Sequence, residues 1–228
     1  MASKSSGNSM RYYVRGSIVP FEEDMYHEFK GHRSISVEEL PPWTHEKNDE
    51  KASRRAVSRA LNAFLNTGKG GTCYLGMLDN GQAKGIELTQ FQKDHVMASI
   101  DEVFSRYSPP VKRHRYKVRF KPVLESDSVD EFERFQSEDA AISDIDRKRP
   151  HTLRTYQYCW CDCDRHAQEQ YCGILIQPYI IEIVIKPWDP DDPRNAEDAV
   201  GTVVKLQPFH EDEEGKVYFR RQASLVQA

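Results

Sequence analysis

The chain has 228 residues, of which 38% are hydrophobic, and its formal net charge is −4. This length and composition suit one α/β domain or two small lobes, and no apolar run approaches the length that spans a membrane. The net negative charge argues against binding to nucleic acid through the surface as a whole, so such binding requires a local basic segment. Residues 1–10 are mostly small and polar, which predicts a disordered leader before a single domain over residues 11–228.

Short apolar or alternating runs predict strands. In chain order these are residues 11–18, 26–31, 72–78, 84–88, 113–122, 153–161, 173–177, 179–188, 203–207 and 216–221. The run Asp79-Asn80-Gly81 is a hairpin turn signal, so residues 84–88 are expected to return against residues 72–78. Residues 125–147 are acidic with little periodicity, which predicts a mobile loop.

Two longer segments have helical periodicity and predict helices over residues 49–67 and 89–107. Gly68 is a suitable stop for the first helix. Thr89 and Gln92 form a capping-box pattern at the start of the second helix. The expected fold is therefore an α/β (α+β) domain with a mixed sheet and two main helices.

Three acidic residues lie at the ends of predicted strands. Glu23 and Glu28 are five residues apart at the start of one strand, and Asp79 ends another. Two glutamates and an aspartate could hold Mg²⁺ or Mn²⁺, with waters left over for a phosphate, and such an ion stabilises charge on phosphoryl oxygens and can activate water. The alternative is that Glu23 is a solvated turn residue and that Asp79 serves an Asp-Asn-Gly turn.

Several motifs follow one another in order across residues 21–89. They are Glu-x4-Glu-Phe-Lys, a helix ending in Phe-Leu-Asn-Thr, and Gly-Gly-x4-Gly-x2-Asp followed by a turn and Gly-Ile. This order resembles the AlbA-like domain of the Schlafen family. The resemblance implies a metal-dependent endoribonuclease that cleaves structured RNA, such as tRNA or small-RNA precursors, with Glu23, Glu28 and Asp79 as catalytic residues. The sequence departs from the family pattern at Leu78, where another acid usually stands, so the site would be altered or weakened.

A basic segment follows the second predicted helix. Every odd position from 113 to 121 is basic, namely Arg113, Arg115, Lys117, Arg119 and Lys121. Because side chains alternate along a strand, these residues are expected to form one cationic stripe about 26 Å long, at about 3.3 Å per residue over eight intervals. Such a stripe can follow an RNA backbone without reading its sequence. The alternative is a solvated strand face. Lys30 is a further candidate, either for phosphate contact or for pairing with a carboxylate.

Four of the five cysteines lie within residues 159–172. Without a secretory signal, they are expected to be reduced thiols in a cytoplasmic, reducing location. The candidate ligands for a structural Zn²⁺ are Cys159, Cys161, Cys163, His166 and Cys172. The alternative is a cysteine-rich hairpin without metal. The remaining histidines are assigned no catalytic role.

The Schlafen resemblance also implies a structural zinc, held in that family by a His-x-Cys motif and a later Cys-Cys pair. His114 matches the histidine, but Tyr116 and Asp189-Pro190 occupy the cysteine positions. The family's zinc site is therefore not preserved, and any zinc site is expected to be relocated to residues 159–172.

The favoured hypothesis is a metal-dependent endoribonuclease or a subunit of one. The alternative is a non-catalytic subunit that binds RNA or DNA or acts as a scaffold. Schlafen cores resemble a clamp of two lobes, and this chain has the length of one. It is therefore expected to pair with itself or with another Schlafen-like subunit around RNA.

Overall fold

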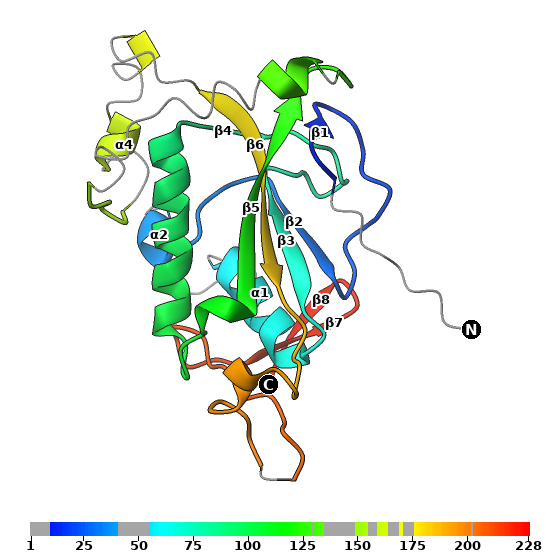
Figure 1. Ribbon diagram of the computed structural model, residues 1–228, viewed down its shortest axis with the longest axis vertical. Coiled ribbons are helices and arrows are strands. Elements are labelled where there is room, and N and C mark those ends of the chain that lie inside the picture. The colour runs from blue at the N-terminus through cyan, green and yellow to red at the C-terminus, as the bar shows by residue number, and fades with distance from the viewer. Residues whose placement is uncertain are drawn as a thin grey trace.

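Figure 1 shows the computed structural model of the chain. It describes residues 10–40, 55–128, 130–134, 149–154, 159–163, 169–170, 176–201 and 203–228. The strands of its main sheet are β1 (Tyr13–Val14), β2 (His27–Lys30), β3 (Gly71–Leu75), β4 (Ile86–Leu88), β5 (Tyr116–Leu124) and β6 (Gln177–Ile185). Within the described residues the sheet order is β1-β5-β6-β3-β2, with β4 also paired to β6. The β1–β5 and β2–β3 pairs are parallel, and β6 is antiparallel to its three partners, so the sheet is mixed as expected.

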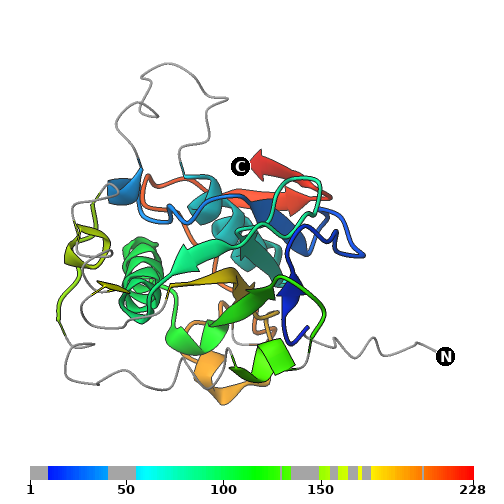
Figure 2. The same ribbon diagram turned by 90° about the horizontal axis from the view of Figure 1, so that it is seen from above.

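Two long helices cover one face of this sheet, α1 (Ala56–Thr67) and α2 (Gln90–Arg106). Phe64 of α1 and Phe104 of α2 join Ile183 of β6 in one buried cluster. Figures 1 and 2 show α2 running beside the sheet, with the short helix α4 (Trp160–Cys163) next to it. The expected α/β fold with two main helices is confirmed. None of the helices in the described ranges has both the length and the apolarity needed to cross a membrane.

The opposite face of the sheet carries a second, smaller apolar cluster. Tyr13, Phe29, Tyr74 and Ile180 belong to it. Because side chains alternate along a strand, the neighbours of these residues in β2, β3 and β6 point toward the helices. This alternation decides on which face each candidate site residue lies.

Local signals set the limits of the helices. The Thr89 hydroxyl accepts from the backbone N–H of Gln92 at 3.2 Å, and the Gln92 side chain accepts from the N–H of Thr89 at 3.0 Å. This capping box confirms the expected start of α2. Gly68 ends α1 in the left-handed conformation, with φ 75°. Gly71 lets the sheet approach α1, because a Cβ there would lie 2.3 Å from the Phe64 ring.

A two-stranded hairpin, β7 (Tyr218–Arg221) and β8 (Ser224–Gln227), packs against α1. Buried asparagines of α1 fix its position. The Asn62 side-chain oxygen accepts from the N–H of Tyr218 at 2.9 Å, and the Asn66 amide donates to the Tyr218 carbonyl at 3.2 Å. The Thr67 hydroxyl accepts from the N–H of Arg220 at 3.0 Å. These bonds fix β7 against α1.

Four strand predictions are wrong in detail. Residues 84–88 were expected to pair with residues 72–78, but β4 pairs with β6. The strand expected over residues 153–161 is wrong at its end, because residues 160 and 161 belong to a helix over residues 160–163. Residues 203–207 contribute only the isolated bridge between Val200 and Leu206. Residues 113–115 form a 3-10 helix, so β5 begins at Tyr116.

Other predictions fall partly or wholly outside the described residues. The parts that lie there are the leader at residues 1–9, the start of the first helix before residue 55, residues 135–148, the middle of the strand expected over 153–161, and most of the strand expected over 173–177. Within the acidic segment, residues 130–134 are helical, and Glu131 accepts from the N–H of Glu125 at 2.9 Å.

Candidate functional site

Glu28 lies in the middle of an ion-paired group at the edge of the sheet. Its position in β2 is paired with Cys73 of β3, so the side chain points to the helix-covered face, where it is 6% exposed. One carboxylate oxygen lies 2.6 Å from the Lys30 ammonium. The other accepts from the guanidinium of Arg220. Both oxygens of this buried carboxylate are therefore paired with cations.

Arg220 joins the C-terminal hairpin to β2. Besides Glu28, its guanidinium donates to the backbone carbonyls of Asp24 at 2.6 Å and His27 at 2.8 Å. It also lies over the ring of Phe64 in α1. This role of Arg220 could not be predicted, because nothing local in the sequence shows that the hairpin returns to β2.

Glu23 lies beside this pair. Since β2 is the last strand of the sheet, the outward N–H of Phe29 is available, and the Glu23 carboxylate accepts from it at 2.8 Å. The Lys30 ammonium is 3.9 Å from Glu23. Burial raises the pKa of Glu23, and the neighbouring Glu28 carboxylate adds to the rise while the Phe29 bond opposes it. We call Glu23, Glu28, Lys30 and Arg220 the Glu28 cluster.

Lys30 is held by the same group of charges. Its ammonium contacts Glu28 and donates to the Phe29 carbonyl at 2.8 Å. Burial alone would lower the pKa of Lys30, but the attraction and hydrogen bond of Glu28 outweigh burial and raise it. Lys30 is therefore a carboxylate partner in this structure, which was one of its two expected roles.

Asp79 lines a pocket that it shares with Glu23. It is exposed, in the turn that follows β3. The pocket has a volume of about 460 Å³, and both Glu23 and Asp79 line it, together with Glu22 and Phe29. Glu28 does not line it. In the part of the chain that the structure describes, the three carboxylates do not form a group whose ligand atoms all lie within 4.8 Å of one another.

The basic stripe is shorter than expected. Lys117, Arg119 and Lys121 alternate along β5, but Arg113 and Arg115 lie in the preceding 3-10 helix. Arg113 lies over the Tyr116 ring at 4.5 Å, and Arg115 is buried over the Trp188 ring at 4.7 Å.

The remaining stripe lies on the face of the sheet opposite to Glu28. Arg119 is paired in register with Glu182 of β6, and its guanidinium lies 3.4 Å from that carboxylate. Lys117 is exposed. Burial, together with repulsion by Arg119 and Lys117, lowers the pKa of Lys121.

Glu182 itself was missed by the sequence analysis. It is 4% exposed in the central strand β6, and it accepts a hydrogen bond of 2.8 Å from the Tyr13 hydroxyl. Burial, followed by the proximity of Glu182, raises the pKa of Tyr13 well above its ordinary value. The signal that could have found Glu182 is a single acid inside the apolar run Ile180-Ile181-Glu182-Ile183.

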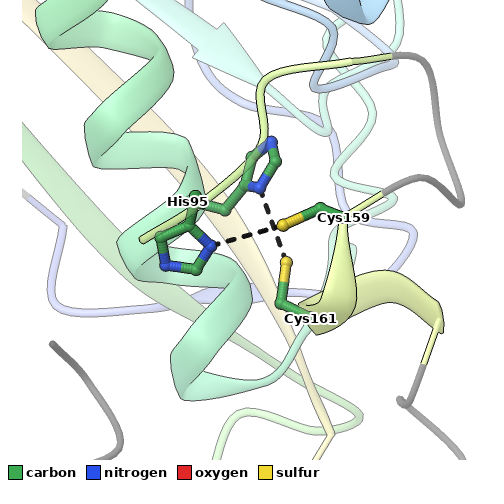
Figure 3. A group of neighbouring side chains, drawn as sticks. His95, Cys159 and Cys161 are labelled. Carbon is green, nitrogen blue, oxygen red and sulfur yellow. Dashed lines mark hydrogen bonds between the residues drawn. The ribbon is translucent and has the colours of Figure 1, made fainter. Parts of the chain in front are cut away.

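A second group of chemically active side chains lies between α2 and α4, on the helix side of the fold. His95 of α2 and His151 meet Cys159 and Cys161, and one ligand atom from each lies within 4.8 Å of all the others. The Cys161 sulfur is 3.5 Å from Nδ1 of His95, and the Cys159 sulfur is 3.6 Å from Nδ1 of His151. Figure 3 shows the sulfurs of Cys159 and Cys161 directed toward the imidazole nitrogens.

This group differs from the expected zinc ligands. Cys159 and Cys161 belong to it, whereas Cys163 is exposed at the end of α4 and is not a member. His166 and Cys172 lie outside the described residues. The histidines were missed because they are distant in sequence. His114, which matches the zinc histidine of the family pattern, instead lies 2.7 Å from the side-chain oxygen of Asn195.

Comparison with known protein families supports the resemblance that the order of motifs in the sequence indicated. The family model described as Schlafen, AlbA_2 matches residues 23–228. The match therefore includes strands β2 to β6 of the main sheet, the Glu28 cluster, Asp79 and the group of histidines and cysteines. The chain belongs to the Schlafen AlbA_2 family.

Proposed function

We propose that this chain is a divalent-metal-dependent endoribonuclease, or a subunit of one, that cleaves structured RNA such as tRNA or small-RNA precursors. The observation that carries the proposal is the pocket shared by Glu23 and Asp79, together with the Lys30 ammonium that lies near both Glu23 and Glu28. Its family context agrees, because the Schlafen AlbA_2 family includes nuclease and RNA-binding members.

Of the three carboxylates, only two are placed to bind a divalent ion such as Mg²⁺ or Mn²⁺ without rearrangement. Glu23 and Asp79 offer carboxylate oxygens to one pocket, and oxygen ligands are those that Mg²⁺ and Mn²⁺ prefer. Glu28 is occupied by Lys30 and Arg220, so it can serve as a ligand only after exchanging Lys30. When bound, such an ion would neutralise charge on the scissile phosphate and activate a water molecule.

The chain's own cations have a complementary part in this proposal. Lys30 is positioned beside both glutamates and, once released from Glu28, would contact a phosphate oxygen. Arg220 keeps three acceptors on residues 24–28, so its part is to position Glu28. Lys117 and Lys121 lie on the face of the sheet opposite to Glu28, and they would hold other phosphates of the same RNA.

A second candidate is an RNA-holding subunit that does not cleave. The specific observation in its favour is that both carboxylate oxygens of Glu28 are already paired, as in a structural ion pair. This candidate predicts RNA affinity that falls with salt and no metal-dependent products.

The proposal includes a partner, another Schlafen-type subunit. Its support is a group of exposed apolar side chains near the end of the chain, Val200, Val203, Val204, Leu206 and Phe209. They line a pocket of about 710 Å³ together with Trp188. Exposed apolar patches of this kind mark interaction surfaces. Light scattering of wild type and Leu206→Asp would test self-association, which the variant should weaken.

The deciding experiment is cleavage of end-labelled tRNA and single-stranded RNA with Mg²⁺, with Mn²⁺ and with EDTA. Because Asp79 is exposed, Asp79→Asn tests the chemistry without disturbing the core. Glu22→Gln is a matched control, since Glu22 is exposed and lines the same pocket. Metal-dependent products that Asp79→Asn loses and Glu22→Gln retains would support a nuclease. Binding without products in all three proteins would favour the RNA-holding subunit.

A further inference from the structure

The histidines and cysteines between α2 and α4 converge from three separate parts of the chain. His95 comes from the middle of α2, His151 from the segment before α4, and Cys159 and Cys161 from the start of α4. His95, Cys159 and Cys161 are buried, and His151 is half-buried. Four soft or borderline ligands that meet inside a protein are the composition of a structural zinc site.

The distances between these atoms fit tetrahedral coordination. Zinc bonds of about 2.0–2.1 Å to nitrogen and about 2.3 Å to sulfur place tetrahedral N and S ligands about 3.6 Å apart. Two of the nitrogen–sulfur separations are 3.5 Å and 3.6 Å. Isolated S–H···N hydrogen bonds would account for either pair alone. Two separate hydrogen bonds would not require all four ligand atoms to lie within 4.8 Å of one another, and this is the arrangement found here.

The surroundings of His95 orient it as a ligand. Its Nε2 lies 2.9 Å from the carboxylate of Glu39, while Nδ1 faces the Cys161 sulfur. A carboxylate on the far nitrogen of a ligating imidazole fixes its orientation and makes it a stronger ligand. Glu39 is itself held, because it accepts from the N–H groups of Ile35 and Ser36.

The helix that carries the cysteines is also fixed from outside the ligand set. Asp162, between Cys161 and Cys163, accepts from the Gln92 side chain at 2.7 Å and pairs with Arg33. Gln92 also belongs to the capping box at the start of α2, where Thr89 is the N-cap. Trp160 packs on Phe91 and stacks on His151. The ligands therefore converge on a framework that holds them without a metal bond.

From this geometry we infer that His95, His151, Cys159 and Cys161 bind one Zn²⁺ ion. Four protein ligands leave no open position, so the site is structural. It ties the segment between β5 and β6 to α2, and it is separate from the Glu28 cluster. The ligand set replaces the one expected from sequence, since it uses two histidines in place of Cys163, His166 and Cys172.

The test is the metal content of the full chain, purified and dialysed against metal-free buffer. One zinc per chain is expected for wild type, and Cys161→Ser should retain only a small fraction of it. Cys163→Ser is the matched control, because Cys163 lies two residues later in the same helix, and it should keep the full content. Absence of zinc from wild type would overturn the proposal, and so would equal loss in Cys163→Ser or Cys172→Ser.

A second measurement does not depend on how well a ligand variant folds. Chelated wild-type protein is titrated with Co²⁺, and a tetrahedral site with two thiolates should give a strong visible absorption band. Glu39→Gln should weaken metal affinity about 10–100-fold, as loss of a carboxylate partner of a ligating histidine does. Glu38→Gln is its control, because Glu38 pairs with Arg106 instead. No absorption band, or equal affinity in the two variants, would contradict the site.

Discussion

Arg220 and Glu28 form a buried ion pair between β7 and β2, although 192 residues separate them in the sequence. Their exposed fractions are 4% and 6%. The pair fixes the C-terminal hairpin to the edge of the sheet, at the point where the candidate catalytic carboxylates lie. If the proposed function is right, stability and activity would both depend on this contact.

Replacement of Arg220 by methionine should destabilise the fold by about 3–5 kcal/mol, because it leaves a buried carboxylate without one of its cations. Urea unfolding of the two proteins would measure the difference. Arg221→Met is the control, since Arg221 is exposed on the same strand, and it should unfold close to wild type. An Arg220→Met midpoint equal to that of wild type would show that the pair contributes no stability.

Replacement by glutamine should weaken RNA binding when it is made at Lys117 and lower stability when it is made at Arg115. Lys117 is exposed on β5, whereas Arg115 is buried against Trp188. If Lys117 contacts one phosphate of single-stranded RNA, Lys117→Gln should reduce the slope of log affinity against log salt by about 0.7. Arg115→Gln should lower stability and leave that slope unchanged. Fluorescence anisotropy of labelled RNA at several salt concentrations would measure both slopes, and an unchanged slope in Lys117→Gln would remove Lys117 from the RNA interface.

The parts of the fold that could be predicted are those determined by neighbours in the sequence. The Thr89 cap needs only Gln92 three residues later, and Gly68 ends α1 by its own backbone conformation. The order of motifs around Glu23, Glu28 and Asp79 was also sufficient to identify the family.

The parts that could not be predicted depend on contacts distant in sequence. An alternating basic pattern does not distinguish a strand from the 3-10 turn at Arg113–Arg115, where the N–H of Arg115 bonds back to Lys112 at 2.9 Å. The meeting of His95 with Cys161 depends on how α2 packs against α4. Glu28 was recognised as an acid, but its pairing with Arg220 depends on where the hairpin docks.

The Thr89 cap should contribute measurably to stability. Thr89→Ala removes the acceptor of the Gln92 N–H, so it should lower the free energy of unfolding by about 1 kcal/mol. Thr89→Ser keeps a hydroxyl at the same position and should retain most of the stability. Denaturant unfolding monitored by circular dichroism would compare the three proteins. Equal losses in the alanine and serine variants would instead assign the effect to packing of the threonine methyl group.

His210 should make stability depend on pH. Burial lowers the pKa of its imidazole from the ordinary value of 6.5, with Arg115 contributing and the Pro109 contact opposing. Nδ1 lies 2.7 Å from the Pro109 carbonyl oxygen, and within the described residues Nε2 is buried without a hydrogen-bond partner. The unfolded chain therefore binds a proton before the folded chain does, so stability should fall as pH decreases below about 6.5. His210→Gln lacks this titration, so urea midpoints at about pH 7.5 and about pH 5.5 should differ less in the variant than in wild type. An equal difference in both proteins would mean that His210 takes up its proton equally well in the folded and unfolded states.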